Sequence, residues 1–121
     1  MRGCLLLAAL VCALAVVPDG ALAHAFLDRA EPRVGSTIKT APAHVRLWFT
    51  GALESAYSRV QVLDEAGQRV DLGDSALDAE RRNVLRVSLP ALPPGRYKVL
   101  WRVLAIDSHV TEGDFTFRVI P

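Results

Sequence analysis

Two histidines and one aspartate have the residue types and the spacing that a metal site requires. Asp107 and His109 lie two residues apart at the end of the apolar run 97–106, and side chains two apart in extended backbone point to the same side. A carboxylate and an imidazole placed in that way can bind one ion together. His24 joins them if the chain is cleaved after Ala23, because the α-amine and the imidazole of one residue can close a chelate ring on a metal ion.

The combined donor set of His24, Asp107 and His109 is three nitrogens and one oxygen. This set suits square-planar or tetragonal Cu(II), which binds most strongly among the divalent first-row metals. The sequence therefore predicts a site for one Cu(II) ion per chain. Each feature alone has a simpler reading, since cleavage can fall before any residue and an aspartate at a strand end often caps a turn. The third histidine, His44, lies just before an expected strand, and we expect it to face solvent and not to bind the metal.

The first 23 residues have the pattern of a cleavable export signal. A basic Arg2 precedes the uncharged apolar run 5–17, and Ala21 and Ala23 form a small-x-small cleavage site. The apolar run is shorter than the ~20 residues needed to span a bilayer, and no other stretch approaches that length. We therefore expect residues 1–23 to be removed, and residues 24–121 to be exported, soluble and not embedded in the membrane.

Sulfur is confined to the expected signal. The only sulfur-bearing residues are Met1, Cys4 and Cys12, so residues 24–121 contain no thiol and no thioether. This composition excludes disulfides and sulfur ligands for Cu(I) in the expected mature chain. The net charge of +1 gives no support to nucleic-acid binding. We also find no nucleophile elbow and no glycine-rich phosphate-binding loop.

The pattern of apolar residues predicts an all-β domain. Residues 24–121 fit one small domain with a single core. Alternating apolar runs at 45–49, 85–89 and 115–119 predict strands, with further strands expected at 26–30, 57–63 and 96–106 and around Val70 and Leu72. About seven short strands favour a Greek-key β-sandwich or flattened β-barrel of the Ig-like type. The polar segment 71–83 is expected to be an exposed loop.

The sequence resembles the CopC family of small periplasmic copper-resistance proteins over essentially the whole of residues 24–121. The resemblance is carried by motifs in family order: His24-Ala25-Phe26-Leu27, Glu31-Pro32 with Gly35-Ser36, residues 45–50, residues 92–97, Trp101-Arg102-Val103, and Asp107-Ser108-His109 with Gly113 and Phe115-Thr116-Phe117. It implies a Greek-key barrel or sandwich in which the N-terminal histidine and the Asp-x-His meet at one Cu(II) ion. The absence of methionine after Met1 resembles the members that bind Cu(II) alone.

Two positions depart from the family pattern. Gly51 stands where a glutamate often follows the Phe-Thr pair, and we do not expect Glu54 to replace that glutamate. Val110 stands where a proline often follows the histidine, which leaves Asp107 and His109 in place.

The resemblance implies a periplasmic Cu(II)-binding protein for copper resistance or homeostasis, which sequesters copper or delivers it to a CopD-like inner-membrane transporter. It implies no enzyme, and a carboxylate in plane with three nitrogens leaves no strong open position for a substrate. Two alternatives stay open. The amine and two imidazoles also resemble the histidine brace of lytic polysaccharide monooxygenases, and the fold alone would suffice for a metal-free Ig-like interaction module.

Overall fold

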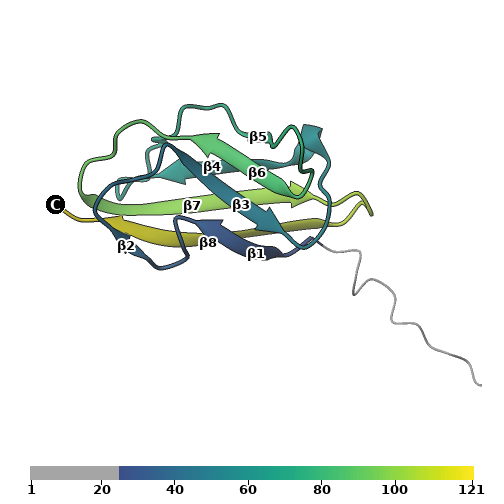
Figure 1. Ribbon diagram of the computed structural model, residues 1–121, viewed down its shortest axis with the longest axis horizontal. Helices are drawn as coiled ribbons and strands as arrows, with labels where there is room; N and C mark the ends of the chain where they lie inside the picture. The colour runs from purple at the N-terminus through teal and green to yellow at the C-terminus, as the bar shows by residue number, and fades with distance from the viewer. Residues whose placement is uncertain (1–24) are drawn as a thin grey trace, which may run out of the picture.

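The computed structural model describes residues 25–121, which form two packed four-stranded sheets (Figure 1). The first sheet has the antiparallel order β1 (Leu27–Glu31), β3 (His44–Phe49), β6 (Val84–Ser88), β5 (Ala76–Leu77). The second has the order β2 (Thr37–Ile38), β8 (Val110–Val119), β7 (Gly95–Leu104), β4 (Arg59–Leu63), with only β2 parallel to its neighbour. One short 3-10 helix, η1 (Ser55–Tyr57), precedes β4. Within residues 25–121, no helix is long and apolar enough to cross a membrane.

The all-β sandwich expected from the sequence is confirmed, with eight strands in place of about seven. The two short strands, β2 and β5, have two residues each and are too short for alternation to reveal them. The strand expected around Val70 and Leu72 is wrong, because the only strand-like pairing of this stretch is an isolated bridge between Arg69 and Leu63. The N–H groups of Val70 and Leu72 donate singly, to the carbonyls of Val62 and Ser88. The expected loop 71–83 contains β5, and the side chain of Asp71 is buried.

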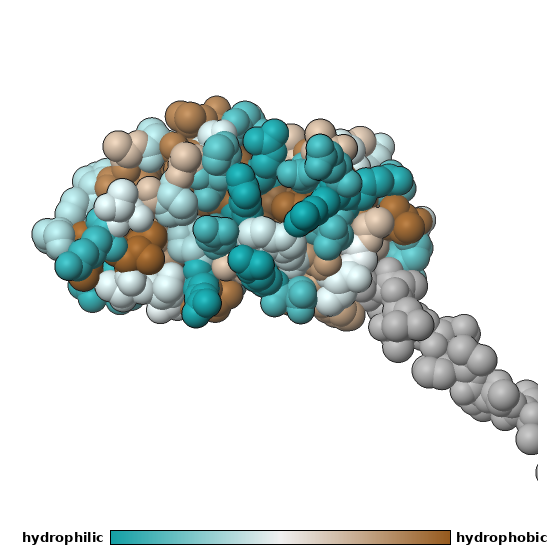
Figure 2. Space-filling model, viewed as in Figure 1, coloured by the Kyte–Doolittle hydropathy of each residue, from teal (hydrophilic) through white to brown (hydrophobic). Residues whose placement is uncertain are grey.

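The core lies between the sheets and is built by the alternating residues that the sequence pattern selected. Val45, Leu47 and Phe49 of β3 are buried, and the inward-facing residues of β7 and β8 meet them. The rings of Tyr97 and Phe117 stack with centroids 5.5 Å apart, and the Tyr97 hydroxyl donates to the carbonyl of Pro93. Burial raises the pKa of Tyr97. Figure 2 shows that the outer face of the sheet containing β3 is largely hydrophilic, as expected for a two-layer sandwich.

The buried Asp71 explains why segment 71–83 is not a free loop. Its carboxylate accepts hydrogen bonds from the backbone N–H of Val62 at 2.8 Å and of Gly73 at 2.9 Å, and from Nε of Arg69 at 2.8 Å. The Ser75 hydroxyl likewise accepts from the N–H of Val60 at 2.9 Å. These contacts satisfy outward-facing groups of β4 and protect an edge that could otherwise pair with another strand.

A close contact between β7 and β8 fixes the hairpin that leads to the candidate site. Trp101 lies directly opposite Gly113, and its indole packs against the ring of Phe49 with centroids 5.2 Å apart. A methyl group on Gly113 would lie 2.6 Å from Cζ2 of Trp101, well inside contact distance. Glycine is therefore required for this strand pair to close over the indole. Trp48, by contrast, lies under Arg29, whose guanidinium carbon is 4.4 Å from the centroid of the Trp48 ring.

We expect Gly113→Ala to lower the free energy of unfolding by about 2 kcal/mol, because the added methyl group overpacks the Trp101 ring, which already packs against Phe49. In a domain of this size the loss corresponds to a fall in Tm of roughly 8–16 °C. Thermal unfolding followed by circular dichroism measures it. Thr116→Ala on the same strand is the control and should change stability by no more than about 0.5 kcal/mol. Equal unfolding temperatures for the two variants would show that the indole moves aside freely.

Candidate metal centre

The turn between β7 and β8 carries Asp107 and His109. β7 ends at Leu104, and beyond it the chain pairs with a different segment. Leu53 forms a bridge with Ala105, and the N–H of Ile106 donates to the carbonyl of Ala52 at 3.2 Å. The turn is closed by two further backbone hydrogen bonds, from Ala105 N–H to the carbonyl of His109 and from Ser108 N–H to the carbonyl of Ala105, both 2.9 Å long. The strand pair thus holds the turn at both of its ends.

Asp107 and His109 are brought together, but not by the extended backbone that the sequence suggested. The N–H of His109 donates to Oδ1 of Asp107 at 3.0 Å, and Oδ2 lies 2.9 Å from Nδ1 of the same histidine. Between them Ser108 has φ of 74°, in the left-handed region. The expectation of extended backbone is therefore wrong: Asp107 and His109 follow the end of β7, which stops at Leu104, and a turn brings the two side chains together.

The contact between Asp107 and His109 determines the orientation of the imidazole ring. A carboxylate beside one ring nitrogen fixes the orientation of the ring, and both groups carry atoms that can bind the same metal ion. Here Oδ2 of Asp107 meets Nδ1, so Nε2 is the ring nitrogen outside this contact. The side chain of His109 is 58% exposed, and the side chain of Asp107 is 19% exposed. The pair can therefore meet an ion that approaches from solvent.

The contact between Asp107 and His109 depends on the left-handed backbone at Ser108. We expect Ser108→Val to lower the free energy of unfolding by about 1–2 kcal/mol, since a β-branched side chain disfavours positive φ, and to separate Asp107 from His109. Thermal unfolding and Cu(II) titration of the variant measure both effects. Ser108→Asn is the matched control, because asparagine tolerates this region. If the valine and asparagine variants behave alike, the turn does not depend on this residue's conformation.

Residue 25, the first that the structure describes, lies beside this turn. The hydroxyl of Thr111 donates to the carbonyl of Ala25 at 2.7 Å, and Ala25 is fully buried. Phe26 exchanges two hydrogen bonds with Thr50, one from its N–H to the threonine hydroxyl at 3.0 Å and one from Thr50 N–H to its carbonyl at 2.8 Å. The beginning of the described chain is thus fixed to Thr111, which follows His109 by two residues. The third expected ligand, His24, lies outside the described residues.

The other residues considered from the sequence lie elsewhere. His44 is the first residue of β3 and pairs with Ser88, at the far end of that strand from Thr50; it is in the strand, and not before it as expected. Glu54 precedes η1, and its carboxylate lies 3.8 Å from the Arg82 guanidinium.

Within residues 25–121, no group of three or more His, Cys, Asp or Glu side chains is placed to hold a metal ion. The sequence did not reveal η1 or the tether at Thr111, because neither has a periodic pattern.

The fold agrees with the comparison with known families. The CopC domain matches residues 27–120, and the chain belongs to the CopC family.

Three relatives show how closely the chain follows this family. The crystal structure of CopC from Methylosinus trichosporium OB3b superposes with a TM-score of 0.72 at 36% identity and covers 81% of this chain and 95% of that one. The crystal structure of PcoC, a methionine-rich copper resistance protein from Escherichia coli, gives a TM-score of 0.70 at 25% identity over 81% and 100% of the two chains. The copper transport protein CutJ of Bacillus subtilis is 27% identical over 107 residues, which is 88% of this chain but 20% of CutJ. CutJ is named for copper transport and PcoC for copper resistance. The expectation of a non-enzyme is confirmed by membership of the CopC family.

Proposed function

We propose that the chain is a periplasmic Cu(II)-binding protein of copper resistance or homeostasis, and that it sequesters copper or delivers it to a CopD-like inner-membrane transporter. In this proposal cleavage after Ala23 makes His24 the first residue. Its amine and imidazole, with Asp107 and His109, then bind one Cu(II) ion. The names of CutJ and PcoC, which refer to copper transport and copper resistance, support the choice of copper.

One observation carries the proposal: Thr111 holds the carbonyl of Ala25 at 2.7 Å, two residues along the chain from His109. Consecutive Cα atoms are about 3.8 Å apart, so the residue bonded to Ala25 starts from a point already fixed beside the turn. A ligand at position 24 therefore needs no long excursion to reach an ion held by the Asp107 and His109 pair. This hydrogen bond between Ala25 and Thr111, which are 86 positions apart in sequence, supports the proposed site.

The proposed donor set also explains why binding, and not turnover, is the favoured chemistry. Three nitrogens and a carboxylate fill the equatorial positions that Cu(II) prefers. A catalytic metal keeps a strong position open for water or substrate. An ion held by Asp107 and His109 would be reachable from solvent, since the side chain of His109 is 58% exposed.

The proposal is tested by titrating protein that begins at His24 with Cu(II) against a competing chelator and recording its electron paramagnetic resonance spectrum. We expect one tightly bound equivalent and the spectrum of a tetragonal site with nitrogen ligands. An unrelated β-sandwich domain without an N-terminal histidine is the control. Affinity no greater than that of the control would favour a metal-free interaction module.

We expect the Cu(II) affinity to fall by at least about 100-fold between pH 7 and pH 5, because the amine and both imidazoles must lose protons to coordinate. The sign follows from proton competition: lower pH protonates the nitrogen ligands and displaces the ion. Competition titrations at pH 5, 6, 7 and 8 measure the slope. An affinity that is constant over this range would rule out nitrogen ligands that titrate there.

A further inference from the structure

The surface around the β7–β8 turn is unusually apolar. Six large apolar side chains are exposed among residues 25–121, and four of them, Phe26, Tyr57, Ile106 and Val110, surround this turn with exposures between 49% and 71%. We call these four residues the turn-end rim. Figure 1 shows the β7–β8 turn and the start of β1 at the same end of the sandwich, and Figure 2 shows hydrophobic atoms exposed at that end. Exposed apolar side chains gathered at one place mark an interaction site.

Hydrogen bonds show that the rim is one continuous feature. The N–H of Ile106 donates to Ala52, and the N–H of Glu54 donates to the carbonyl of Leu104 at 2.8 Å, which holds η1 and its Tyr57 against the end of β7. Phe26 is joined to the same segment through Thr50. The rim therefore combines residues from the first strand region, from η1 and from both sides of the turn.

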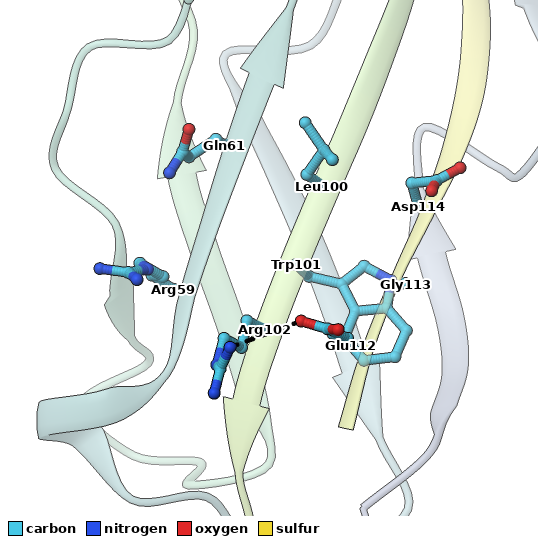
Figure 3. A pocket seen from close by; sticks show the side chains of 8 residues that line it. All are labelled: Arg59, Gln61, Leu100, Trp101, Arg102, Glu112, Gly113 and Asp114. Carbon is cyan, nitrogen blue, oxygen red and sulfur yellow. Dashed lines mark ion pairs between the residues drawn. The ribbon is translucent and has the colours of Figure 1, made fainter. Parts of the chain in front are cut away.

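A groove runs from the rim onto the outer face of the second sheet. Tyr57, Leu104 and Val110 line its apolar wall, and Arg59 and Arg102 line the other. The two arginines lie directly opposite each other on β4 and β7. Figure 3 shows the continuation of this face, with Glu112 on β8 beside Arg102.

The groove carries an excess of positive charge. Arg102 meets Glu112 at 3.6 Å with both side chains more than half exposed, a weak pairing. Arg59 forms no ion pair within the described part of the chain. Arg59 and Arg102 line the groove and no carboxylate of the described residues does, so the groove is complementary to a segment that places carboxylates next to apolar side chains.

We propose that the turn-end rim and this groove dock a protein that exchanges copper with the chain, through an exposed segment of alternating apolar and acidic residues. The inference rests on the proposed function. Direct transfer requires the partner's ligands to come close to Asp107 and His109, so any such complex covers the rim that surrounds them. The charge of the groove opposes a second copy of the chain, because copies that meet there bring Arg59 and Arg102 of each against the other. CutJ is about five times the length of its matching region, so that relative carries such a domain joined to further protein.

The test measures copper transfer from the Cu(II)-loaded protein to purified CutJ by rapid mixing. We expect Tyr57→Ser and Arg59→Glu each to lower the second-order rate constant at least tenfold, as for residues at the centre of an interface. Added salt should slow transfer by the unaltered protein and have little effect on the Arg59→Glu variant. Leu72→Ser and Val34→Ser are matched controls, because these residues are similarly exposed but lie away from the turn. They should stay within twofold of the unaltered protein.

The outcomes separate this inference from the proposed function. Cu(II) affinities of all variants are measured first; an unaltered protein that binds no copper contradicts the proposed function itself. Equal copper affinities together with equal transfer rates, or no transfer to CutJ at all, overturn the docking proposal alone. Self-association of the loaded protein that Tyr57→Ser abolishes would assign the rim to a second copy, and binding to anionic phospholipid vesicles that the same change abolishes would assign it to a membrane. Both results also overturn the proposal.

Discussion

We expect protein that carries one extra residue before His24 to bind Cu(II) at least about 100-fold more weakly than protein that begins at His24. The extra residue turns the amine into a peptide nitrogen, which removes one ligand and breaks the chelate ring. Loss of groups that only orient a ligand already costs roughly 10–100-fold in metal affinity, so the loss of a ligand costs more. The measurement is a competition titration, with the resonance spectrum as a check on the number of nitrogens.

The control for this experiment is an extra residue placed after Pro121, which changes the mass equally and lies at the other end of the chain. The spectrum of that variant should match the unaltered protein. Identical spectra and affinities for the two extended proteins would show that the N-terminal amine is not a ligand. The proposed processing after Ala23 would then have no part in the metal site.

The second large effect is expected from His109→Ala, which removes an imidazole from the turn together with its 2.9 Å contact to Asp107. We expect the Cu(II) affinity to fall by at least about 100-fold. The variant should stay folded, because the side chain of His109 is 58% exposed and lies outside the core. Competition titration and thermal unfolding together distinguish a lost ligand from a lost fold.

His44→Ala is the matched control, because His44 lies at the far end of β3 from the turn. Its copper affinity should equal that of the unaltered protein within about twofold. Similar losses for the two alanine variants would mean that copper binds at several exposed imidazoles and not at one defined site.

The sandwich was predictable because its core strands bury one face and expose the other. The alternation of Val45, Leu47 and Phe49 recurs in β6 and β8, and period-two burial is a property of the strand itself. β2 and β5 were not predictable, since each has two residues and is defined by its neighbours. The burial of Asp71 was also hidden, because polar composition does not reveal which carboxylate binds backbone N–H groups of another strand.

The Asp107 and His109 pair was predictable as a pair, since both side chains carry metal-binding groups at close spacing. Its backbone was not predictable, because the end of β7 depends on contacts that Ala52 and Leu53 make from a distant part of the chain. The same holds for the arginines of the groove, which share one register across β4 and β7 but are 43 positions apart in sequence. Pairing between strands determined each of these results.

The hydrogen bond from Thr111 to Ala25 joins positions 86 residues apart, almost the full length of the described chain. An ion bound by His24 and His109 would close nearly the same long loop covalently. Small exported domains usually close such loops with disulfides, which limit the freedom of the unfolded chain. This chain has no cysteine after Cys12, so copper would act as a removable cross-link in place of sulfur. Loading with copper would then make the domain more resistant to proteolysis and to thermal unfolding.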